Sequence, residues 1–244
     1  CIRDRCCSCI YYKVIMTRNV AIILSGGSGS RMECDIPKQY LKIHGKMIIS
    51  YSLECFVCNK HIDGLIIAID PKWKRILEDE TNSFDIPIHF AISGESRQYT
   101  IFNALKVAEM FYAPSDIVII HDAARPLVTD VLIDECINVC QKYDGAMPVL
   151  PMKDTIYESY DGLSISSVLN RDILFAGQAP EAFKLGKYIN ACKSMNREEL
   201  LLVRGSAEIA YKAGMKVKLI KGDERNFKVT VPEDLVRLKL LLEK

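Results

Sequence analysis

The sequence predicts an α/β fold built on a doubly wound, mostly parallel, Rossmann-like sheet. Short apolar runs alternate with amphipathic segments about every 20 to 25 residues, as in a series of strand and helix units. The apolar runs are about five to seven residues long, which is strand length and far below the roughly 20 residues of a membrane-spanning helix. In such a sheet, the ligand site is expected beyond the carboxyl ends of the strands.

Strands and helices are expected to alternate over the first part of the chain. Apolar runs predict strands at 19–24, 64–69, 86–92 and 116–120. Amphipathic segments predict helices at 47–57, 73–79, 100–111 and 131–143. Because helices separate these strands, we expect the strands to run parallel in one sheet with helices on its faces.

The alternation stops between about 147 and 175, where we expect a β-arm. This stretch shows period-2 runs separated by Tyr160, Asp161 and Gly162, and it has no helical period. We interpret it as an arm that leaves the sheet. The alternation then returns with a strand at 216–220 and with helices at 185–195, at about 207–213 and from Pro232 onward.

The length of 244 residues fits one domain, which we place at 16–244 after an N-terminal leader at 1–15. The leader has neither an initiating Met nor the layout of a signal peptide, so we expect it to be disordered or foreign to the native product. Lys and Arg number 32 and Asp and Glu 31, so no global basic field indicates nucleic acid or an anionic membrane. We expect a cytoplasmic protein with small-molecule partners, no nucleic acid and no membrane.

Ten cysteines are spread over the chain, four of them in the leader. Cys55 and Cys58 form a C-x-x-C motif on a predicted helix, but no second pair has the spacing of a zinc site. Core packing in a reducing compartment is the favoured interpretation, and metal or redox chemistry is the alternative. Cys136 and Cys140 are one helical turn apart, which predicts a buried helix face.

A glycine-rich loop follows the first predicted strand. Gly26, Gly27 and Gly29 permit backbone conformations that a side chain would forbid, so successive N–H groups can converge on phosphate oxygens. The glycine spacing excludes a Walker A loop, and Met32 excludes the dinucleotide fingerprint, which needs a glycine there. An ordinary tight turn between strand and helix is the alternative.

Two cations flank this loop. Arg31 lies at its end, and Lys38 follows seven residues later in a turn directed by Pro37. A solvated surface lysine is the alternative interpretation of Lys38. Two cations beside a glycine loop suit a triphosphate.

Six motifs occur in the order typical of the cytidylyltransferases that activate sugar-alcohol phosphates. They are GGSGSRM, PKQYL, SGESRQYTIFNAL, HDAARPL, KDTI and NFKVTVPEDL, and they cover about Val20 to the C-terminus. The chain resembles the 2-C-methyl-D-erythritol 4-phosphate cytidylyltransferases of the non-mevalonate isoprenoid pathway, and also the ribitol-5-phosphate cytidylyltransferases. The resemblance implies a nucleotidyltransferase sheet, Mg²⁺ or another divalent cation held mainly by the CTP phosphates, and a homodimer with shared active sites in which the β-arm serves dimerisation.

The resemblance also implies roles for individual residues in a reaction that joins a polyol phosphate to the α-phosphorus of CTP and releases pyrophosphate. The expected catalytic cations are Arg31, Lys38 and Lys228. The expected nucleotide-binding residues are Ser25, Gly26, Gly27, Gly29, Gly94, Arg97, Thr100 and Asp122. The expected acceptor-binding residues are Asp122, Arg125, Thr155 and Arg171, the last two acting from the β-arm on the other subunit's nucleotide. No residue is assigned to the metal.

Several of these residues have a purely structural alternative. Asp122 and Thr100 are both suited to capping a following helix. The alternative for Arg125 is a surface salt bridge, and the alternative for Lys228 is an exposed lysine on a strand. His121, beside Asp122, is expected to be structural.

The chain departs from the family's pattern at two places. Ala179 and Glu181 stand in a stretch that usually reads Q-T-P-Q, so a hydroxyl is lost and a negative charge is added, which argues against a phosphate contact there. Arg204 and Gly205 replace a usual Thr-Asp pair, and Ser206 is expected as a helix N-cap. Arg204 is a candidate for compensating the lost phosphate contact.

The HDAARP motif and the overall pattern favour methylerythritol phosphate as the acceptor. Trp73 and the stretch 170–178 resemble the ribitol phosphate enzymes instead, so ribitol 5-phosphate is the alternative acceptor. A non-catalytic, nucleotide-binding regulatory relative is an alternative of another class, motivated by Ala179 and Arg204. The retained cations argue against it.

Overall fold

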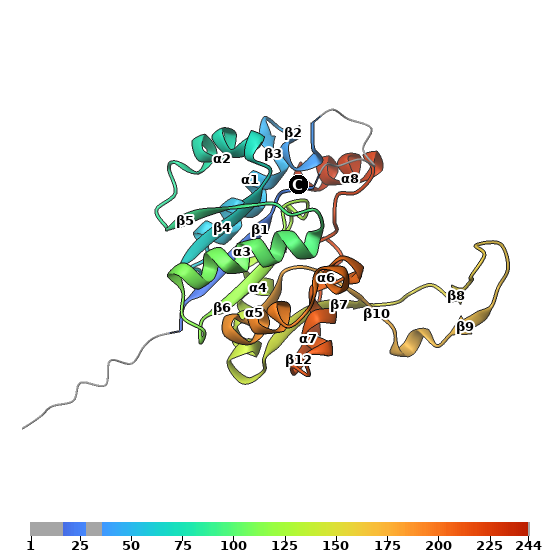
Figure 1. Cartoon of the computed structure of the whole chain (residues 1–244). Helices are drawn as coiled ribbons and strands as arrows, with labels where there is room; N and C mark the ends of the chain where they lie inside the picture. The colour runs from blue at the N-terminus through green and yellow to red at the C-terminus, as the bar shows by residue number, and fades with distance from the viewer. Residues whose placement is uncertain (1–16, 28–35, 244) are drawn as a thin grey trace, which may run out of the picture.

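The computed structural model of the chain describes residues 17–27 and 36–243, so the expectations for the leader, Gly29 and Arg31 lie outside the described residues. An eight-stranded mixed sheet forms the centre of the described structure (Figure 1). Its strands lie in the order β10-β7-β11-β6-β1-β4-β5, and β12 pairs with the other edge of β7. The bounds are β1 Asn19–Leu24, β4 Gly64–Ile69, β5 Ile88–Ile92, β6 Ile117–Asp122, β7 Gly145–Pro151, β10 Phe175–Gly177, β11 Glu181–Lys184 and β12 Val217–Lys221.

The parallel part of the sheet contains β5, β4, β1 and β6. β1 pairs in parallel with β4 on one side and with β6 on the other, and β4 pairs in parallel with β5. β4 and most of β1 and β6 are buried runs of Ile, Val, Leu and Ala, as expected for strands with helices on both faces. The chain passes from β5, on one side of β1, to β6 on the other. The predicted fold class is confirmed, and the reversal at β1 and β6 marks where such a sheet opens a ligand crevice.

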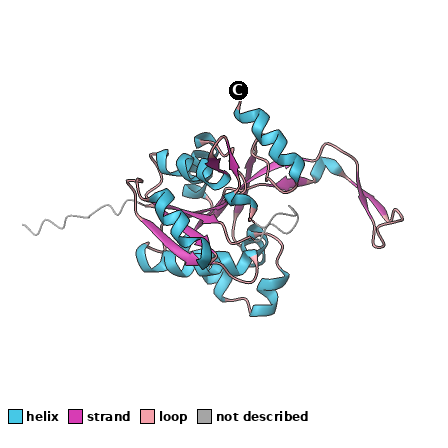
Figure 2. Ribbon diagram, turned by 90° about the horizontal axis from the view of Figure 1, so that it is seen from above, coloured by secondary structure: helices cyan, strands magenta, loops and turns pink. Residues whose placement is uncertain are grey.

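Helices cover both faces of the sheet (Figure 2). Alternate residues of β1 point to opposite faces, so Ala21 and Ile23 join one core cluster while Val20 and Ile22 join the other. The first cluster is covered by α1 Ile48–Cys58, α2 Lys74–Thr81 and α4 Asp130–Lys142. The second is covered by α3 Arg97–Phe111, α5 Leu185–Lys193, α6 Arg197–Leu202 and α7 Ser206–Lys212. None of the helices in the described residues has the length and apolar character that a membrane crossing requires.

Short elements near the sheet edges were less predictable. The last helix, α8 Pro232–Leu242, has its proline in the first turn as predicted. The two-residue strands β2 Lys42–Ile43 and β3 Lys46–Met47 and the helix α6 were not predicted. The strand β11 was also missed. It lies antiparallel between β6 and β7. Because it is only four residues long, its sequence is too short to show a period of hydrophobicity.

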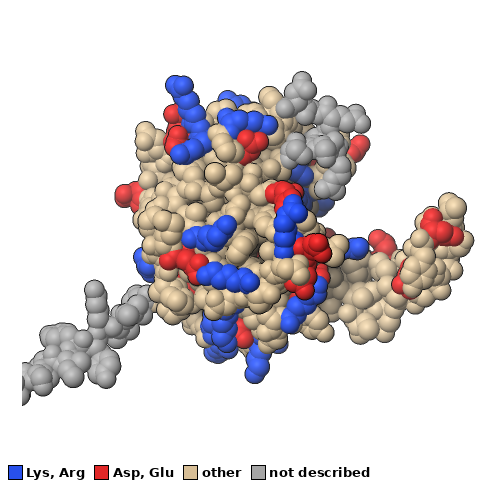
Figure 3. All heavy atoms as spheres, viewed as in Figure 1, with Lys and Arg blue, Asp and Glu red and all other residues tan. Residues whose placement is uncertain are grey.

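The β-arm projects away from the body of the molecule (Figures 1 and 2). Its strands β8 Ile156–Glu158 and β9 Ser167–Leu169 pair antiparallel, and the 3-10 turn η4 Arg171–Ile173 follows them. Strand β7 stays in the main sheet up to Pro151 and β10 returns to it at Phe175, so the projecting part is 152–174. Basic and acidic side chains are mixed on the body, whereas most of the visible arm surface is uncharged (Figure 3).

The cysteines of the described residues are free thiols. Cys136 and Cys140 are buried on one face of α4, as predicted from their spacing. Cys55 is half-buried, and burial raises its pKa to about 12, so this thiol stays protonated near neutral pH. Cys58 is exposed, in contrast to the predicted core packing.

Candidate active site

A pocket of about 400 Å³ opens at the carboxyl edge of the parallel strands, a volume within the usual range for small-ligand sites. It lies where the strand order reverses, between β1 and β6, and beside the last residues of these two strands. Its wall comprises Leu24, Gly26, Gly27, Lys38, Gln39, Gly94, Glu95, Ser96, Arg97, Thr100, Asp122, Ala124, Lys228 and Thr230. The structure therefore brings together eight residues predicted from five separate motifs.

The glycine loop after β1 forms one wall, and its first glycine is needed for close approach. A Cβ on Gly26 would lie 2.2 Å from the Cβ of Ser93, which follows β5. Neither Gly26 nor Gly27 has a positive φ, so the predicted conformational reason does not hold for these two positions. The structure instead favours glycine at position 26 because the segments that follow β1 and β5 lie too close together for a side chain.

The side chain of Gln39 anchors this loop by two hydrogen bonds. Its Nε2 donates to the carbonyl oxygens of Ser25 at 2.7 Å and Gly27 at 2.8 Å. The Ser25 hydroxyl donates to the Tyr40 hydroxyl at 2.8 Å, and Ser25 is buried and does not line the pocket. Lys38 belongs to the same 3-10 turn, η2 Lys38–Tyr40, and lines the pocket, which argues against a purely solvated surface lysine.

The start of α3 forms a second wall. The Gly94 N–H donates to Thr100 Oγ1 at 3.0 Å, and Thr100 Oγ1 donates to the Ser96 carbonyl at 2.9 Å. A Cβ on Gly94 would lie 2.4 Å from the Cβ of Tyr99, so only glycine fits against this helix turn. Ser96 is the N-cap of α3, so the capping alternative for Thr100 is wrong.

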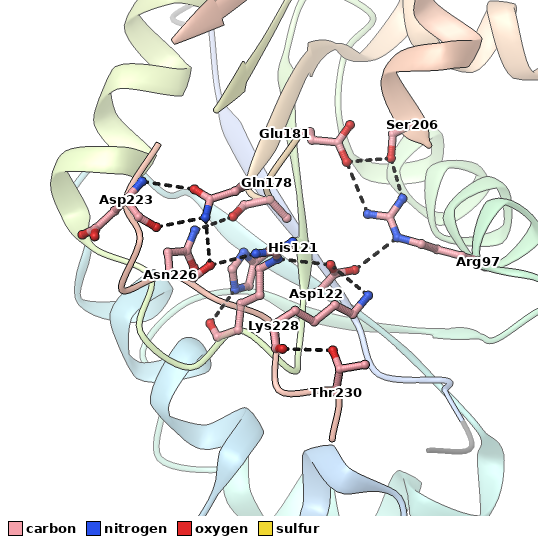
Figure 4. A network of polar contacts seen from close by, with 12 residues as sticks. Arg97, His121, Asp122, Gln178, Glu181, Ser206, Asp223, Asn226, Lys228 and Thr230 are labelled. Atoms are coloured by element: carbon pink, nitrogen blue, oxygen red, sulfur yellow. Dashed lines mark hydrogen bonds and ion pairs between the residues drawn. The ribbon is translucent and has the colours of Figure 1, made fainter. Parts of the chain in front are cut away.

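Asp122, at the end of β6, is surrounded by three cations (Figure 4). Its Oδ1 lies 3.1 Å from Arg97 Nε, and its Oδ2 lies 3.2 Å from Lys228 Nζ and 3.4 Å from Arg125 Nε. Burial alone would raise the pKa of Asp122, but Arg97, Lys228 and Arg125 outweigh it and hold the pKa far below its usual range. The cap of the next helix, α4, is Thr129, so the capping alternative for Asp122 is wrong.

Arg97 is held from its other side by a buried acid and a hydroxyl. Its Nη2 lies 3.3 Å from Glu181 Oε1 and its Nη1 donates to Ser206 Oγ at 2.7 Å, while Ser206 Oγ donates to Glu181 Oε1 at 3.0 Å. Burial raises the pKa of Glu181, and Arg97 opposes that shift. The N-cap of α7 is Gly205, so the prediction of Ser206 as the cap is wrong, because its hydroxyl binds Arg97 and Glu181 instead.

Three further predictions can be compared with where the side chains of Arg204, Lys228 and His121 lie. Arg204 is exposed and does not line the pocket, so the structure gives no support for its predicted compensating role. Lys228 lies on an irregular loop before α8 and pairs with Asp122, so the exposed-strand alternative is wrong. His121 is fully buried against Phe56, and burial lowers its pKa to about 4, which fits the predicted structural role.

Three predicted acceptor residues do not line the pocket. Arg125 lies behind Asp122 and donates from Nη1 to the Asn226 carbonyl at 2.7 Å. Thr155 and Arg171 are exposed on the β-arm, which projects away from the pocket (Figure 1). Arg171 donates from Nη1 to the carbonyl of Lys153 at 2.7 Å. Within one chain, the arm residues and the pocket stay apart.

Comparison with known proteins identifies the family. The family model of 2-C-methyl-D-erythritol 4-phosphate cytidylyltransferase (IspD) matches residues 19–244. The chain belongs to this family. The cytidylyltransferase of that name from Clostridium perfringens is 36% identical over 228 residues, which is 91% of this chain and 97% of the relative. The one from Caldanaerobacter subterraneus is 34% identical over 227 residues, covering 92% and 98%.

Solved structures agree with the family assignment. The crystal structure of the Francisella tularensis 2-C-methyl-D-erythritol 4-phosphate cytidylyltransferase has a TM-score of 0.78 and 26% sequence identity, covering 92% of this chain and 99% of the other. IspD proteins are nucleotidyltransferases of the cytidylyltransferase class. The family predicted from the six motifs is therefore confirmed.

Sequence reasoning missed several pocket residues of this IspD protein. Gln39 lies beside a predicted cation, and Thr230 lies in the same late motif as Lys228, so both could have been predicted from the motifs.

Glu181, which does not line the pocket, was recognised as a departure from the family pattern, but its partners were not predicted. It belongs to β11 and contacts Arg97 from α3 and Ser206 from α7, a combination that no local pattern reveals.

Proposed function

We propose that this chain transfers a cytidylyl group from CTP to 2-C-methyl-D-erythritol 4-phosphate, forming the CDP-polyol and pyrophosphate in isoprenoid biosynthesis. The family match over residues 19–244 carries the proposal. The pocket supports it, because Lys38 and Lys228 line one cavity at the sheet edge, where a triphosphate finds positive charges. The five described cysteines are free, which suits a reducing cytoplasm.

The reaction is a substitution at the α-phosphorus of CTP. A phosphate oxygen of the acceptor forms the new P–O bond, the bond to the β-phosphate oxygen breaks, and pyrophosphate leaves with the electron pair. Because both reactants are anions, Lys38 and Lys228, together with Arg31 from outside the described residues, are proposed to offset their repulsion. The acceptor phosphate is itself the nucleophile, so a covalent enzyme intermediate is not required.

Asp122 is proposed to orient cations in this reaction. Its lowered pKa keeps it ionised across the neutral range, so it is unsuited to donating a proton. It holds Lys228 by one oxygen and Arg97 by the other. Arg125 is proposed to support Asp122 from behind, and contact between Arg125 and the acceptor stays a prediction.

The cytosine end is assigned to the start of α3. Gly94 brings the backbone to the pocket surface, and the Thr100 hydroxyl is held by backbone groups on both sides. Each of the three guanidinium nitrogens of Arg97 donates a hydrogen bond to a protein acceptor, so we propose that Arg97 forms a fixed wall of the nucleotide site. The loop at Gly26 and Gly27 is assigned to the phosphates.

We propose that Mg²⁺ enters with the triphosphate. Among the described residues, two carboxylates line the pocket: Asp122, which contacts cations through both oxygens, and Glu95, which pairs with Arg197 at 2.6 Å. Among residues 17–27 and 36–243, no three His, Cys, Asp or Glu side chains group as metal ligands. This donor set fits a cation carried mainly by phosphate oxygens, and the cation would neutralise phosphate charge.

A homodimer with shared sites is proposed from the β-arm. The arm exposes Tyr160 at 86% and Leu163 at 93%, which is more apolar surface than a short hairpin leaves to water without a partner. Thr155 and Arg171 lie on the same arm, remote from the pocket of their own chain (Figure 1). If a second copy receives the arm, these residues reach the pocket of that copy.

The proposal is tested by an acceptor screen. Purified protein is supplied with CTP, Mg²⁺ and either 2-C-methyl-D-erythritol 4-phosphate or ribitol 5-phosphate, and pyrophosphate release is measured. We expect turnover with the methylerythritol phosphate and at least tenfold lower kcat/KM with ribitol 5-phosphate. A preference for ribitol 5-phosphate would overturn the acceptor, and tight CTP binding without turnover on either would indicate a regulatory relative. Equal rates with ATP would refute the cytosine site.

A further inference from the structure

Two buried amides, Gln178 and Asn226, hold the loop that carries Lys228. We infer that they are positioning residues for Lys228, forming a latch between the return strand of the β-arm and this loop, 222–230. The inference rests on the proposed function, which makes Lys228 a catalytic cation. Gln178 and Ala179 follow directly after β10, whereas Asn226 precedes Lys228 by two residues.

The Gln178 amide binds the beginning of the loop by two hydrogen bonds, one donated and one accepted. Its Nε2 donates to the Asp223 carbonyl at 2.9 Å, and its Oε1 accepts from the Asp223 N–H at 3.1 Å. Its own N–H donates to the Pro148 carbonyl at 2.8 Å, which ties it to β7. A Cβ on Gly222 would lie 2.4 Å from Gln178 Oε1, so a side chain at this position would displace the amide from the loop.

Asn226 grips the loop just before Lys228. It is fully buried, and its Nδ2 donates to the Ala179 carbonyl at 2.7 Å. Its carbonyl accepts from Arg125 Nη1 at 2.7 Å, and the Nε of the same arginine lies 3.4 Å from Asp122 Oδ2. Figure 4 shows the consequence: one chain of contacts runs from Asn226 past Asp122 to Lys228.

The loop is also tied down after the lysine. The Val229 N–H donates to the Ala124 carbonyl at 2.8 Å, and the Thr230 hydroxyl donates to the Lys228 carbonyl at 2.9 Å. Lys228 therefore lies between two anchors, and the latch supplies the first. Since Asp122 binds cations from three directions, the latch determines which part of the pocket the ammonium of Lys228 faces. A displacement of about 1 Å in a charge-stabilising group costs about a hundredfold in rate, so this anchoring matters for turnover.

A double-mutant cycle tests the latch. Gln178→Met and Asn226→Ala are made in the wild type and in Lys228→Met, and kcat, KM for CTP and Tm are measured for each. In the wild-type background we expect kcat to fall about ten- to a hundredfold, with a much smaller change in KM. In the Lys228→Met background the same substitutions should lower Tm but leave the remaining kcat unchanged, because the group they position is gone.

The control is Asn59→Ala. Asn59 is also a buried amide, and its Nδ2 bonds to Asp130 at 2.9 Å and to Asp134 at 3.0 Å, away from the pocket. It should lower Tm with kcat unchanged. Equal factors of kcat loss in both backgrounds, or a fall in Tm without a fall in kcat, would overturn the latch.

A second measurement does not depend on turnover. Amide hydrogen exchange across 222–230 is followed in the protein without substrate. We expect faster exchange in Gln178→Met and Asn226→Ala than in Asn59→Ala and the wild type, because the loop loses its first anchor. Unchanged exchange would overturn the latch whatever the acceptor screen shows. Absence of turnover in the wild type would instead refute the proposed function alone.

Discussion

The pocket and the β-arm present their polar side chains in opposite ways. In the pocket, Arg97 and Lys228 converge on the buried carboxylate of Asp122, and the Ser206 hydroxyl and the Glu181 carboxylate accept the other hydrogen bonds of Arg97. On the arm, Thr155 and Arg171 are exposed, and Arg171 bonds to a backbone carbonyl of the arm itself. One region has its charges fixed by the fold, and the other presents them outward.

This difference indicates which steps one chain can perform alone. A pre-organised set of charges needs no rearrangement to receive CTP, which is the condition for strong electrostatic stabilisation. The arm is two short strands with exposed apolar side chains, which suits the proposed contact with a second copy of the chain. We therefore expect pocket variants to fail within their own chain and arm variants to fail through the neighbouring chain.

The largest effect is expected from Lys38→Ala. Removing this pocket cation should lower kcat by about a hundredfold or more, since charge on the pentacoordinate phosphorus loses a partner. The measurement is pyrophosphate release at saturating CTP, with Tm as the check of folding. Lys42→Ala, at an exposed position on β2, is the matched control and should retain normal kcat. Normal turnover in Lys38→Ala would refute the role of this cation.

Arg171→Ala should also lower activity strongly, but in trans. Because Arg171 is exposed, Tm should stay close to the wild-type value. Mixing Arg171→Ala with Lys38→Ala subunits should restore about a quarter of the wild-type activity, since random pairing gives half mixed dimers with one intact site each. Activity is measured after subunit exchange has been demonstrated. No recovery at that point would count against shared sites.

A moderate effect is expected from Gln39→Ala. The substitution removes the amide donor shared by the carbonyls of Ser25 and Gly27 and loosens the glycine loop, at a cost of about 1 to 3 kcal/mol. KM for CTP should rise several-fold and Tm should fall. Gln141→Ala, on the exposed side of α4, is the control and should change neither. An unchanged KM would show that the loop does not need this support.

The smallest effect is expected from Glu181→Gln and depends on pH. Burial raises the pKa of Glu181 above 4.5, so its contribution to stability is present below pH 4.5 and is lost as pH rises through the raised pKa. Glutamine does not titrate, so the Tm of the variant minus that of the wild type should increase from about pH 4 to 7.

Glu208→Gln is the opposite control for this pH series. A hydrogen bond from Lys212 lowers the pKa of Glu208, so its contribution is present above pH 4.5 and is lost as pH falls. The difference in Tm should therefore decrease as pH rises, and by a small amount because this pair is at the surface. A flat or falling difference for Glu181→Gln would contradict the buried charge inferred at that position.

Much of the fold and the pocket could be predicted from local patterns. Short continuous apolar runs separated by amphipathic segments indicate buried parallel strands, and β1, β4 and β6 were found within about two residues of their predicted bounds. Lys38, Asp122 and Lys228 were predicted from motifs, and Asp122 lies in the pocket because it ends a parallel strand at the edge where the ligand site was expected. The antiparallel β11 was missed, because a four-residue strand has no measurable period.

The sequence by itself determined the layers of the fold, the edge that carries the site and the family, because these depend on periodicity and on motifs read in order. Only the tertiary structure decided which partner each cation takes. Arg97, Glu181 and Ser206 lie on three different elements, and their contact follows from long-range packing. The tertiary structure was also needed to show that the arm projects away from the pocket of its own chain, because the direction of a hairpin depends on the sheet to which it is joined (Figure 1).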